Sequence, residues 1–218
     1  MGERAMTVLS GVDIRGRLRE PNLDKRLVVS PILEAVEQLK DGNSSIDLRL
    51  GCEFAFVVPS LHGSIDELST DSLQSSEARL SRLYRKIYVP LANAVHIHPH
   101  QFVLAQALEY LRLPMDLMAY VVGRSTWGRL GLTVATAIGV HPGYAGCLTL
   151  ELRNLGETPL TLRPGQTIAQ LFFHTVIPGR DLGASGQYRG SVDLLPRRMS
   201  SSKTKSKLAH LHELMKHE

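Results

Sequence analysis

Two groups of residues between positions 123 and 173 carry side chains that could do chemistry. Gly123-Arg124-Ser125-Thr126 combines a turn, a guanidinium group and two hydroxyls. A polyphosphate binds well to such a segment, because charged donors, hydroxyls and closely spaced backbone N–H groups all bond its oxygens. Glu151 lies between the apolar residues Leu150 and Leu152. Desolvation there would raise the pKa of its carboxyl toward neutrality, which suits proton transfer. The combination indicates nucleotide chemistry.

Alternating apolar and polar residues indicate the strands that would position these groups. Ser45 to Leu50 alternates in this way, and the pattern returns after Lys86. Further strands are predicted at 102–108, 117–122, 131–137, 146–153, 159–162 and 167–176. Turns such as Pro142-Gly143 separate them. A run of short strands of this kind predicts a mainly β protein with a distorted jelly-roll or β-barrel core.

Two short helices are expected near the N-terminus. Within residues 7–20, Ser10 is a candidate N-cap that precedes apolar residues at helical spacing. A second helix is predicted over residues 31–40, with Ser30 as its cap and Pro31 in its first turn.

Composition divides the chain into one core and its appendages. Residues 1–178 are expected to form a single domain, in which the polar segment 60–83 is a surface insertion. Residues 179–218 are rich in Gly, Ser, Arg and Pro and end in a basic tail. We expect this region to be flexible, serving either as a lid over a phosphate site or as a disordered terminus.

Overall charge argues against several classes of partner. The 218 residues include 25 basic and 21 acidic side chains, and much of the excess of +4 lies in the tail, so no nucleic-acid surface is expected.

No apolar run is long enough for a membrane span, and the first residues lack a signal peptide, which predicts a cytoplasmic protein. Cys52 and Cys147 are far apart and lack the spacing of a zinc site or a disulfide framework.

The segment from Gly123 to Leu132 resembles the phosphate motif of the dCTP deaminase and dUTPase superfamily. Its sequence is Gly-Arg-Ser-Thr-Trp-Gly-Arg-Leu-Gly-Leu. The resemblance continues through Ser45-Ile46-Asp47-Leu48-Arg49-Leu50-Gly51, Val140-His141-Pro142-Gly143-Tyr144-Ala145-Gly146, Leu150-Glu151-Leu152 with Asn154, and residues 162–171. It covers most of residues 8–176 and implies a dUTPase-like β fold.

Glu151 distinguishes the two branches of this superfamily. In the deaminases an acid on this strand activates the water that attacks C4 of cytosine. The dUTPases instead use an Asp in the preceding turn, where this chain has His141. The resemblance therefore implies zinc-independent deamination of dCTP to dUTP and ammonia. A dUTP or dCTP pyrophosphatase, a bifunctional enzyme, and a deoxynucleotide-binding regulator without turnover are the alternatives.

The resemblance also implies roles for individual residues. Ser125 and Arg129 would hold the catalytic water and polarise the base together with Glu151. Arg124, Ser125 and Thr126 would bind phosphate oxygens. The backbone near Ala137 would bound the pyrimidine, and Tyr144 would pack under the deoxyribose. The other expected substrate-binding residues are His141, Thr149, Gln170, Gln187, Tyr188 and Ser191. Magnesium would be bound through the triphosphate, and the protein would be a homotrimer, because this superfamily builds each site from neighbouring subunits.

Several residues depart from the superfamily pattern or have a simpler interpretation. Gln187 stands in place of a Lys and Ser191 in place of a Gln, so one charged phosphate partner is missing. Glu151 could be an edge-strand acid paired with Arg153 or Arg163, and Tyr144 a core aromatic. His96, His98 and His100 alternate as metal ligands would, although a half-exposed strand is the simpler interpretation. Trp127 occupies a position that is usually small, where it would pack at a subunit contact or crowd the site.

Overall fold

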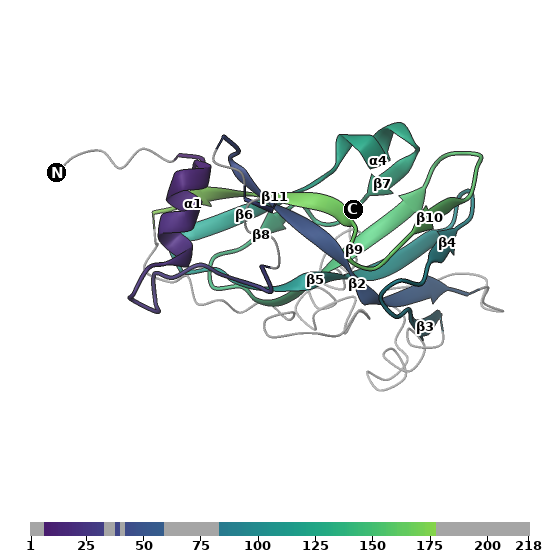
Figure 1. The fold of residues 1–218 in the computed structure, drawn as a ribbon, viewed down its shortest axis with the longest axis horizontal. Coiled ribbons are helices and arrows are strands. Elements are labelled where there is room, and N and C mark those ends of the chain that lie inside the picture. The colour runs from purple at the N-terminus through teal and green to yellow at the C-terminus, as the bar shows by residue number, and fades with distance from the viewer. Residues whose placement is uncertain (1–6, 33–37, 40–41, 59–82, 178–218) are drawn as a thin grey trace, which may run out of the picture. The chain divides into compact units, whose positions relative to one another are not determined.

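The computed structural model describes residues 7–32, 38–39, 42–58 and 83–177 (Figure 1). Its elements are α1 (Gly11–Leu18), β1 (Val28–Ser30), β2 (Ser45–Val57), β3 (Tyr84–Tyr88), β4 (Val95–Ile97), β5 (Phe102–Arg112), β6 (Leu117–Gly123), α4 (Ser125–Arg129), β7 (Leu132–Val134), β8 (Gly139–Val140), β9 (Ala145–Asn154), β10 (Leu160–Leu162) and β11 (Thr167–Thr175). Strands dominate the described residues, as the sequence predicts. The predicted insertion at 60–83 lies outside them except for Leu83, and the predicted C-terminal lid and tail lie wholly outside them.

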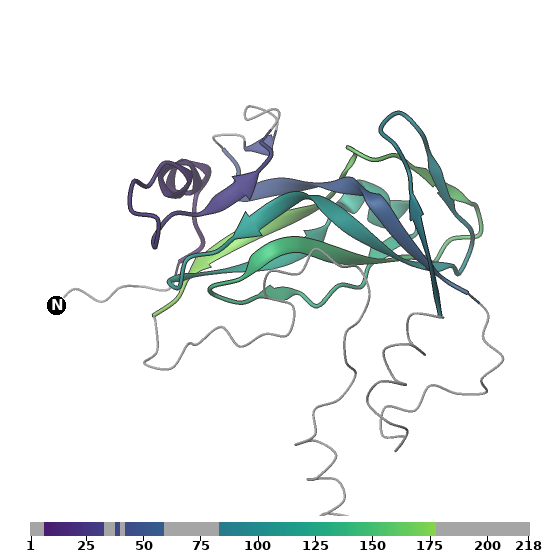
Figure 2. The same ribbon diagram turned by 90° about the horizontal axis from the view of Figure 1, so that it is seen from below.

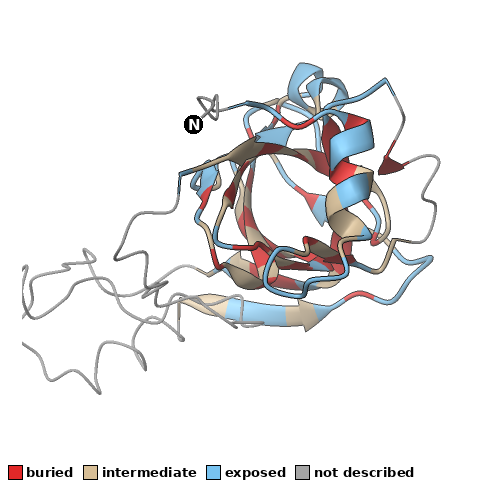
Figure 3. Cartoon of the chain, turned by 90° about the vertical axis from the view of Figure 1, so that its left-hand side faces the viewer, coloured by how far each residue is buried: buried red, intermediate tan, exposed pale blue. Residues whose placement is uncertain are grey.

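The described residues of 7–56 and 86–177 belong to one compact unit. Its main sheet has the order β7-β9-β5-β2-β11-β6-β8, and neighbouring strands in this order run antiparallel. Strand β1 pairs with β5, and β4 pairs with β10 in a separate ribbon. Viewed from the side in Figure 3, the main sheet curls around a buried interior. The curl brings Gly123 at the end of β6 so close to Val134 of β7 that an added Cβ would lie 3.2 Å from its Cγ2 atom.

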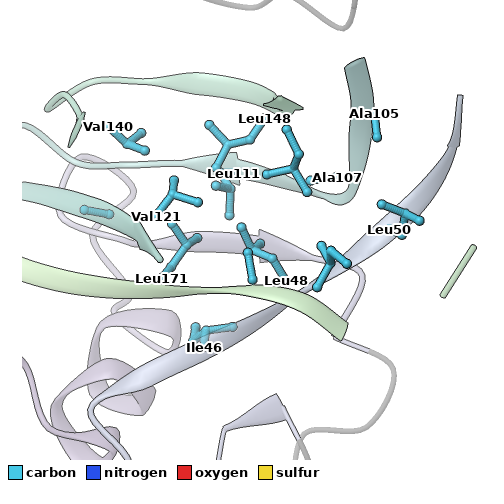
Figure 4. Close-up of a cluster of buried hydrophobic side chains, with 14 of the residues drawn as sticks. Ile46, Leu48, Leu50, Ala105, Ala107, Leu111, Val121, Val140, Leu148 and Leu171 are labelled. Carbon is cyan, nitrogen blue, oxygen red and sulfur yellow. The ribbon is translucent and has the colours of Figure 1, made fainter. Parts of the chain in front are cut away.

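Leucine, isoleucine, valine and alanine side chains fill the interior of the curled sheet (Figure 4). Ten of them are labelled there: Ile46, Leu48, Leu50, Ala105, Ala107, Leu111, Val121, Val140, Leu148 and Leu171. Ile46, Leu48 and Leu50 are completely buried, so the alternation in the sequence indicates the inward face of β2 correctly. The strand continues past the predicted end at Leu50, to Val57.

The first predicted helix is confirmed as α1, and its cap is the predicted one. The Ser10 hydroxyl accepts a hydrogen bond from the Asp13 backbone N–H at 3.2 Å, and the Asp13 carboxylate accepts one from the Ser10 backbone. This reciprocal pair satisfies two N–H groups that a helix start leaves open.

The predicted start of the second helix is wrong. Ser30 belongs to β1, where it pairs with Tyr110 of β5. Pro31 and Ile32 are not helical, and residues 33–37 and 40 lie outside the described residues.

Helix α1 lies at one end of the sheet (Figure 2) and is attached to β11 and to the residue before β6. Arg17 forms two hydrogen bonds with the Asp116 carboxylate, of 3.0 and 2.5 Å, just before β6. The backbone of Leu9 bonds Phe173 of β11, and Val176 bonds the Asp116 carbonyl. No helix among the described residues is long and apolar enough to cross a membrane.

Candidate active site

The predicted phosphate motif joins the end of β6 to α4. Arg124 follows the last residue of β6, and its backbone N–H donates to the Ile168 carbonyl on the neighbouring strand β11 at 3.1 Å. Ser125 to Arg129 then form a five-residue helix where the sequence predicted only a turn. The side chains of Ser125, Thr126 and Arg129 are exposed, and none is hydrogen-bonded to another described residue. All three are therefore available to a ligand.

Arg124 is held by an acid that the sequence analysis did not select. Its Nη1 atom lies 2.8 Å from Oδ1 of Asp47 on β2. The same oxygen accepts a hydrogen bond of 3.1 Å from Nε2 of Gln170 on β11. The structure thus brings two of the predicted phosphate-binding residues, Arg124 and Gln170, to one carboxylate.

Strand register explains why these three side chains meet. Gln170 pairs with Asp47 of β2 on one side and with Val122 of β6 on the other, so the three residues share one face of the sheet. Arg124 lies two residues beyond Val122 and returns to that same face.

Glu151 lies on β9, between β5 and β7. It pairs with Leu104 of β5, while its carbonyl accepts from the Ala135 N–H at 2.7 Å and its N–H donates to the Thr136 hydroxyl at 2.8 Å. Thr136 therefore replaces a ladder partner, which explains why β7 ends at Val134 instead of reaching the predicted residue 137.

The Glu151 carboxyl is half-buried, and burial raises its pKa above the ordinary value. It forms no ion pair with Arg153, Arg163 or any other residue of the described part of the chain. The simpler interpretation, an edge-strand acid paired with arginine, is therefore wrong. A desolvated carboxyl without a partner is suited to exchanging protons with a ligand or water.

Thr149 and Ala137 lie close along the chain to residues that share the strand of Glu151 or bond its backbone. Thr149 is two residues from Glu151 on β9, so the two side chains share a face of the strand. Ala137 directly follows Thr136, whose hydroxyl bonds the Glu151 backbone. Glu151, Thr149 and Ala137 thus form a second group, separate from the phosphate motif along the sheet.

Tyr144 packs partly against the hydrophobic core, and its hydroxyl donates to the Cys147 carbonyl at 2.9 Å. Burial raises the pKa of this hydroxyl. These contacts support the core-aromatic interpretation. His141, which follows β8, is exposed, and its carbonyl accepts from the Tyr144 N–H at 3.2 Å.

Within the described residues, no hydrogen bond or ion pair joins the Glu151 carboxylate to Ser125 or Arg129. Strand β7, which follows α4 in the chain and pairs with β9, connects the two groups, as does the close approach of Gly123 to Val134. Gln187, Tyr188 and Ser191 lie outside the described residues, so their predicted roles stay predictions.

Comparison with known proteins places this arrangement in a family. Residues 8–176 match the sequence profile described as "DCD: dCTP deaminase-like". The chain belongs to the dCTP deaminase-like family. A relative named "dCTP deaminase, dUMP-forming" from Methanobrevibacter smithii is 34% identical over 201 residues, covering 92% of this chain and 96% of the relative. One named "dCTP deaminase" from Natronomonas pharaonis is 37% identical over 167 residues, covering 76% and 79%.

A solved structure supports the same fold. The 2′-deoxycytidine 5′-triphosphate deaminase from Agrobacterium tumefaciens superposes with a TM-score of 0.57 at 23% identity. The match covers 79% of this chain and 50% of that chain, so the matched part corresponds to half of that protein. The predicted family and the predicted dUTPase-like β fold are both confirmed.

Two residues singled out in the sequence have structural roles in this member of the dCTP deaminase-like family. Trp127 on α4 donates from Nε1 to the Thr167 carbonyl at 2.9 Å and packs against the core, so it fastens the helix to β11. His96 bonds the Thr161 hydroxyl across the β4–β10 ribbon at 3.0 Å. The three alternating histidines do not share one strand, since β4 ends at Ile97, and the described residues contain no cluster of three potential metal-binding side chains.

Proposed function

We propose that this protein catalyses the hydrolytic deamination of dCTP, with Glu151 as the group that moves protons. The supporting observation is the half-buried Glu151 carboxyl, whose pKa burial raises and which has no partner among the described residues. It lies within the segment that matches a dCTP deaminase-like family, and relatives at 34–37% identity carry that activity in their names.

The proposed reaction proceeds through addition and elimination at C4 of cytosine. Ionised Glu151 takes a proton from water as the water oxygen bonds C4. The C4–N4 bond then breaks as that proton passes to the departing amine, and the proton of the C4 hydroxyl moves to N3 of the ring, so that dCTP and water yield a uracil nucleotide and ammonia. Ser125 and Arg129 would orient the water and stabilise the developing charge, as the family resemblance implies. The hydrogen bond from the Glu151 N–H to Thr136 fixes the backbone that carries this catalytic carboxylate.

The triphosphate would bind at Arg124, Ser125, Thr126 and Gln170, whose donors suit phosphate oxygens. A magnesium ion would bind together with the nucleotide, and the described residues contain no cluster of three His, Cys, Asp or Glu side chains. It would be held chiefly by phosphate oxygens, whose charge it would screen. No zinc enters the proposed mechanism.

The product is proposed to be dUTP, because His141 stands where the resembling dUTPases have the Asp used for triphosphate hydrolysis. A bifunctional enzyme that releases dUMP is the second candidate. The name of the Methanobrevibacter smithii relative, "dCTP deaminase, dUMP-forming", favours it.

We further propose a homotrimer in the cytoplasm. Among the described residues of one chain, no hydrogen bond or ion pair joins the Glu151 carboxylate to Arg129, which supports a site completed by a neighbouring subunit.

Incubation with dCTP and Mg²⁺ tests the proposal. Ammonia release measures deamination, and chromatography distinguishes dUTP from dUMP plus pyrophosphate. Intact dCTP at high protein concentration would contradict the enzymatic function. Tight calorimetric binding of dCTP without product would instead select the nucleotide-binding regulator, to which the departures at His141, Gln187 and Ser191 point.

A further inference from the structure

The acid that holds Arg124 is itself built into the fold. Asp47 lies on β2, and its side chain is only 17% exposed. Its Oδ1 atom accepts from both Arg124 and Gln170, two residues that are 77 and 123 positions away in the chain. One carboxylate oxygen of β2 therefore binds both β11, through Gln170, and the start of α4, through Arg124.

A buried network fixes the backbone around Asp47. The Asp47 carbonyl accepts from Nε2 of Gln38 at 3.2 Å, and the same nitrogen lies 3.0 Å from the carboxylate of Glu109. Glu109, which is fully buried, also accepts from the backbone N–H of Arg49 at 2.9 Å and from its Nε at 2.7 Å. Hydrogen bonds thus hold β2 on both sides of Leu48, so the position of the Asp47 side chain is determined by the interior of the protein.

The contact with Asp47 leaves most of the Arg124 guanidinium free. Only Nη1 is used, and no other described residue bonds Nη2 or Nε. A guanidinium presents its donors in a planar fork, so one fixed nitrogen determines where the remaining donors point. The Arg124 side chain is 36% exposed, which leaves those donors open to a ligand.

We propose that Asp47 is a positioning residue for the polyphosphate. It holds one nitrogen of Arg124, with Gln170 on the same oxygen, so that the free edge of the guanidinium is directed at the β- and γ-phosphates before the nucleotide binds. This role rests on the proposed function, because it concerns the same nucleotide site. Asp47 does not contact the reacting base, so its effect is on the binding of the phosphates and not on the proton transfer.

The test compares nucleotides that differ in phosphate number and cannot turn over. α,β-Imido-dUTP has no amino group to lose and no hydrolysable α–β bond, and dUMP lacks the outer phosphates. For Asp47→Ala, we expect the Kd for α,β-imido-dUTP with Mg²⁺ to rise about tenfold, the loss typical of one charged hydrogen bond, and the Kd for dUMP to change less than about twofold. Asp47→Asn retains an oxygen acceptor for Arg124 and should recover most of the affinity.

Asp116→Ala is the matched control. It also removes a carboxylate paired with arginine, but this one lies before β6 and is paired with Arg17 of α1, away from the phosphate motif. It should leave both Kd values within about twofold, because its loss affects stability and not phosphate binding. In turnover assays Asp47→Ala should raise the KM for dCTP with little change in kcat.

Three outcomes would overturn the role of Asp47. These are unchanged affinity for the triphosphate in Asp47→Ala, an equal loss for dUMP and α,β-imido-dUTP, and an equal loss in Asp116→Ala. A wild-type chain that binds neither nucleotide would instead contradict the proposed function itself.

Discussion

Glu151 combines two properties that rarely occur together on a surface acid. Its carboxyl is half-buried, and none of the described arginines neutralises it. A carboxyl paired with Arg153 would have a stabilised charge and would be a weak base. Desolvation acts in the opposite direction and raises the pKa, which makes the ionised form more basic.

Replacement of Glu151 with Gln should therefore remove turnover and leave binding. We expect kcat for dCTP deamination to fall by about a hundredfold or more, the contribution typical of general acid–base catalysis. The Kd for α,β-imido-dUTP should stay within about threefold, because phosphate binding rests on Arg124 and its neighbours. An equal loss of affinity and turnover would show that Glu151 acts on the fold instead of on the reaction.

The same carboxyl determines the expected acid limb of the pH profile. A general base must be ionised, and a raised pKa means that the active form is lost as pH falls through a value above the ordinary pKa of about 4.3 for Glu. The rate kcat/KM should thus decline on the acid side at a pH above that value. An acid limb that stays unchanged in the residual activity of Glu151→Gln would assign it to another group.

The sequence predicts the residues that carry local motifs but not those defined by distant partners. Glu151 and Arg124 lie in short motifs that can be read without a structure. Asp47 is as visible in the sequence, yet its importance depends on contacts with residues 77 and 123 positions away. The sequence does not indicate that Glu109 is buried, because an acid in an alternating strand normally faces solvent. It lies on the buried face of β5 with Ala107 and Leu111, where Arg49 and Gln38 bond its carboxylate.

At the scale of elements, the indole of Trp127 adds to the Arg124 contacts that hold the start of α4. This helix has five residues and no side-chain cap, so its own hydrogen bonds stabilise it little. The indole of Trp127 fastens it to the Thr167 carbonyl at the start of β11. Ser125 and Arg129, the two predicted catalytic residues of α4, are placed through this anchor.

Trp127→Phe keeps an aromatic ring but removes the N–H donor and part of the indole that packs against the core. We expect the free energy of unfolding to fall by about 1 kcal/mol, and the KM for dCTP to rise severalfold because α4 loses its anchor. Urea denaturation and steady-state kinetics measure the two effects. Thr126→Ser on the same helix is the control and should change stability by less than about 0.5 kcal/mol, as expected for a substitution at an exposed position. A less stable Trp127→Phe with an unchanged KM would limit the indole to a structural role.

The comparison of α1 with α4 shows which helices a sequence can predict. Helix α1 begins with a reciprocal cap three residues apart, so its start is encoded locally. The start of α4 has no such signal, and its tertiary anchor lies 40 residues away in the chain. The same limit explains Ser30, whose pairing with Tyr110 of β5 outweighs its preference for capping a helix.

For the whole molecule, the Arg17–Asp116 pair joins α1 to the strand that leads to the site. Burial raises the pKa of Asp116, but the hydrogen bond and charge of Arg17 outweigh it and lower the pKa overall. Since the folded pKa lies below the unfolded one, the stabilisation is present above the unfolded pKa of about 4 and is lost as pH falls through the folded value.

Asp116→Asn should consequently lower the free energy of unfolding by about 1 kcal/mol at neutral pH, in the range of partly exposed ion pairs. The difference from the wild type should shrink as the pH falls below about 4. Urea denaturation of both proteins at one protein concentration, near pH 7 and near pH 3, measures the difference. A difference that stays constant with pH would mean that the charge of Asp116 contributes nothing.

Assembly is the scale at which the two groups of site residues would meet. Glu151 and Arg129 are both required by the proposed reaction, yet no hydrogen bond or ion pair joins their side chains in the described part of one chain. If a neighbouring subunit supplies one of them, Glu151→Gln and Arg129→Gln chains are each inactive but complement each other. In a trimer of head-to-tail contacts refolded from an equal mixture, about one site in four would combine two native residues. We therefore expect about a quarter of wild-type deamination from the mixture and almost none from either variant alone.

Light scattering checks that the mixture is trimeric. Activity no higher than that of the separate variants would place Glu151 and Arg129 in the same chain, and the site would then have to close within one subunit.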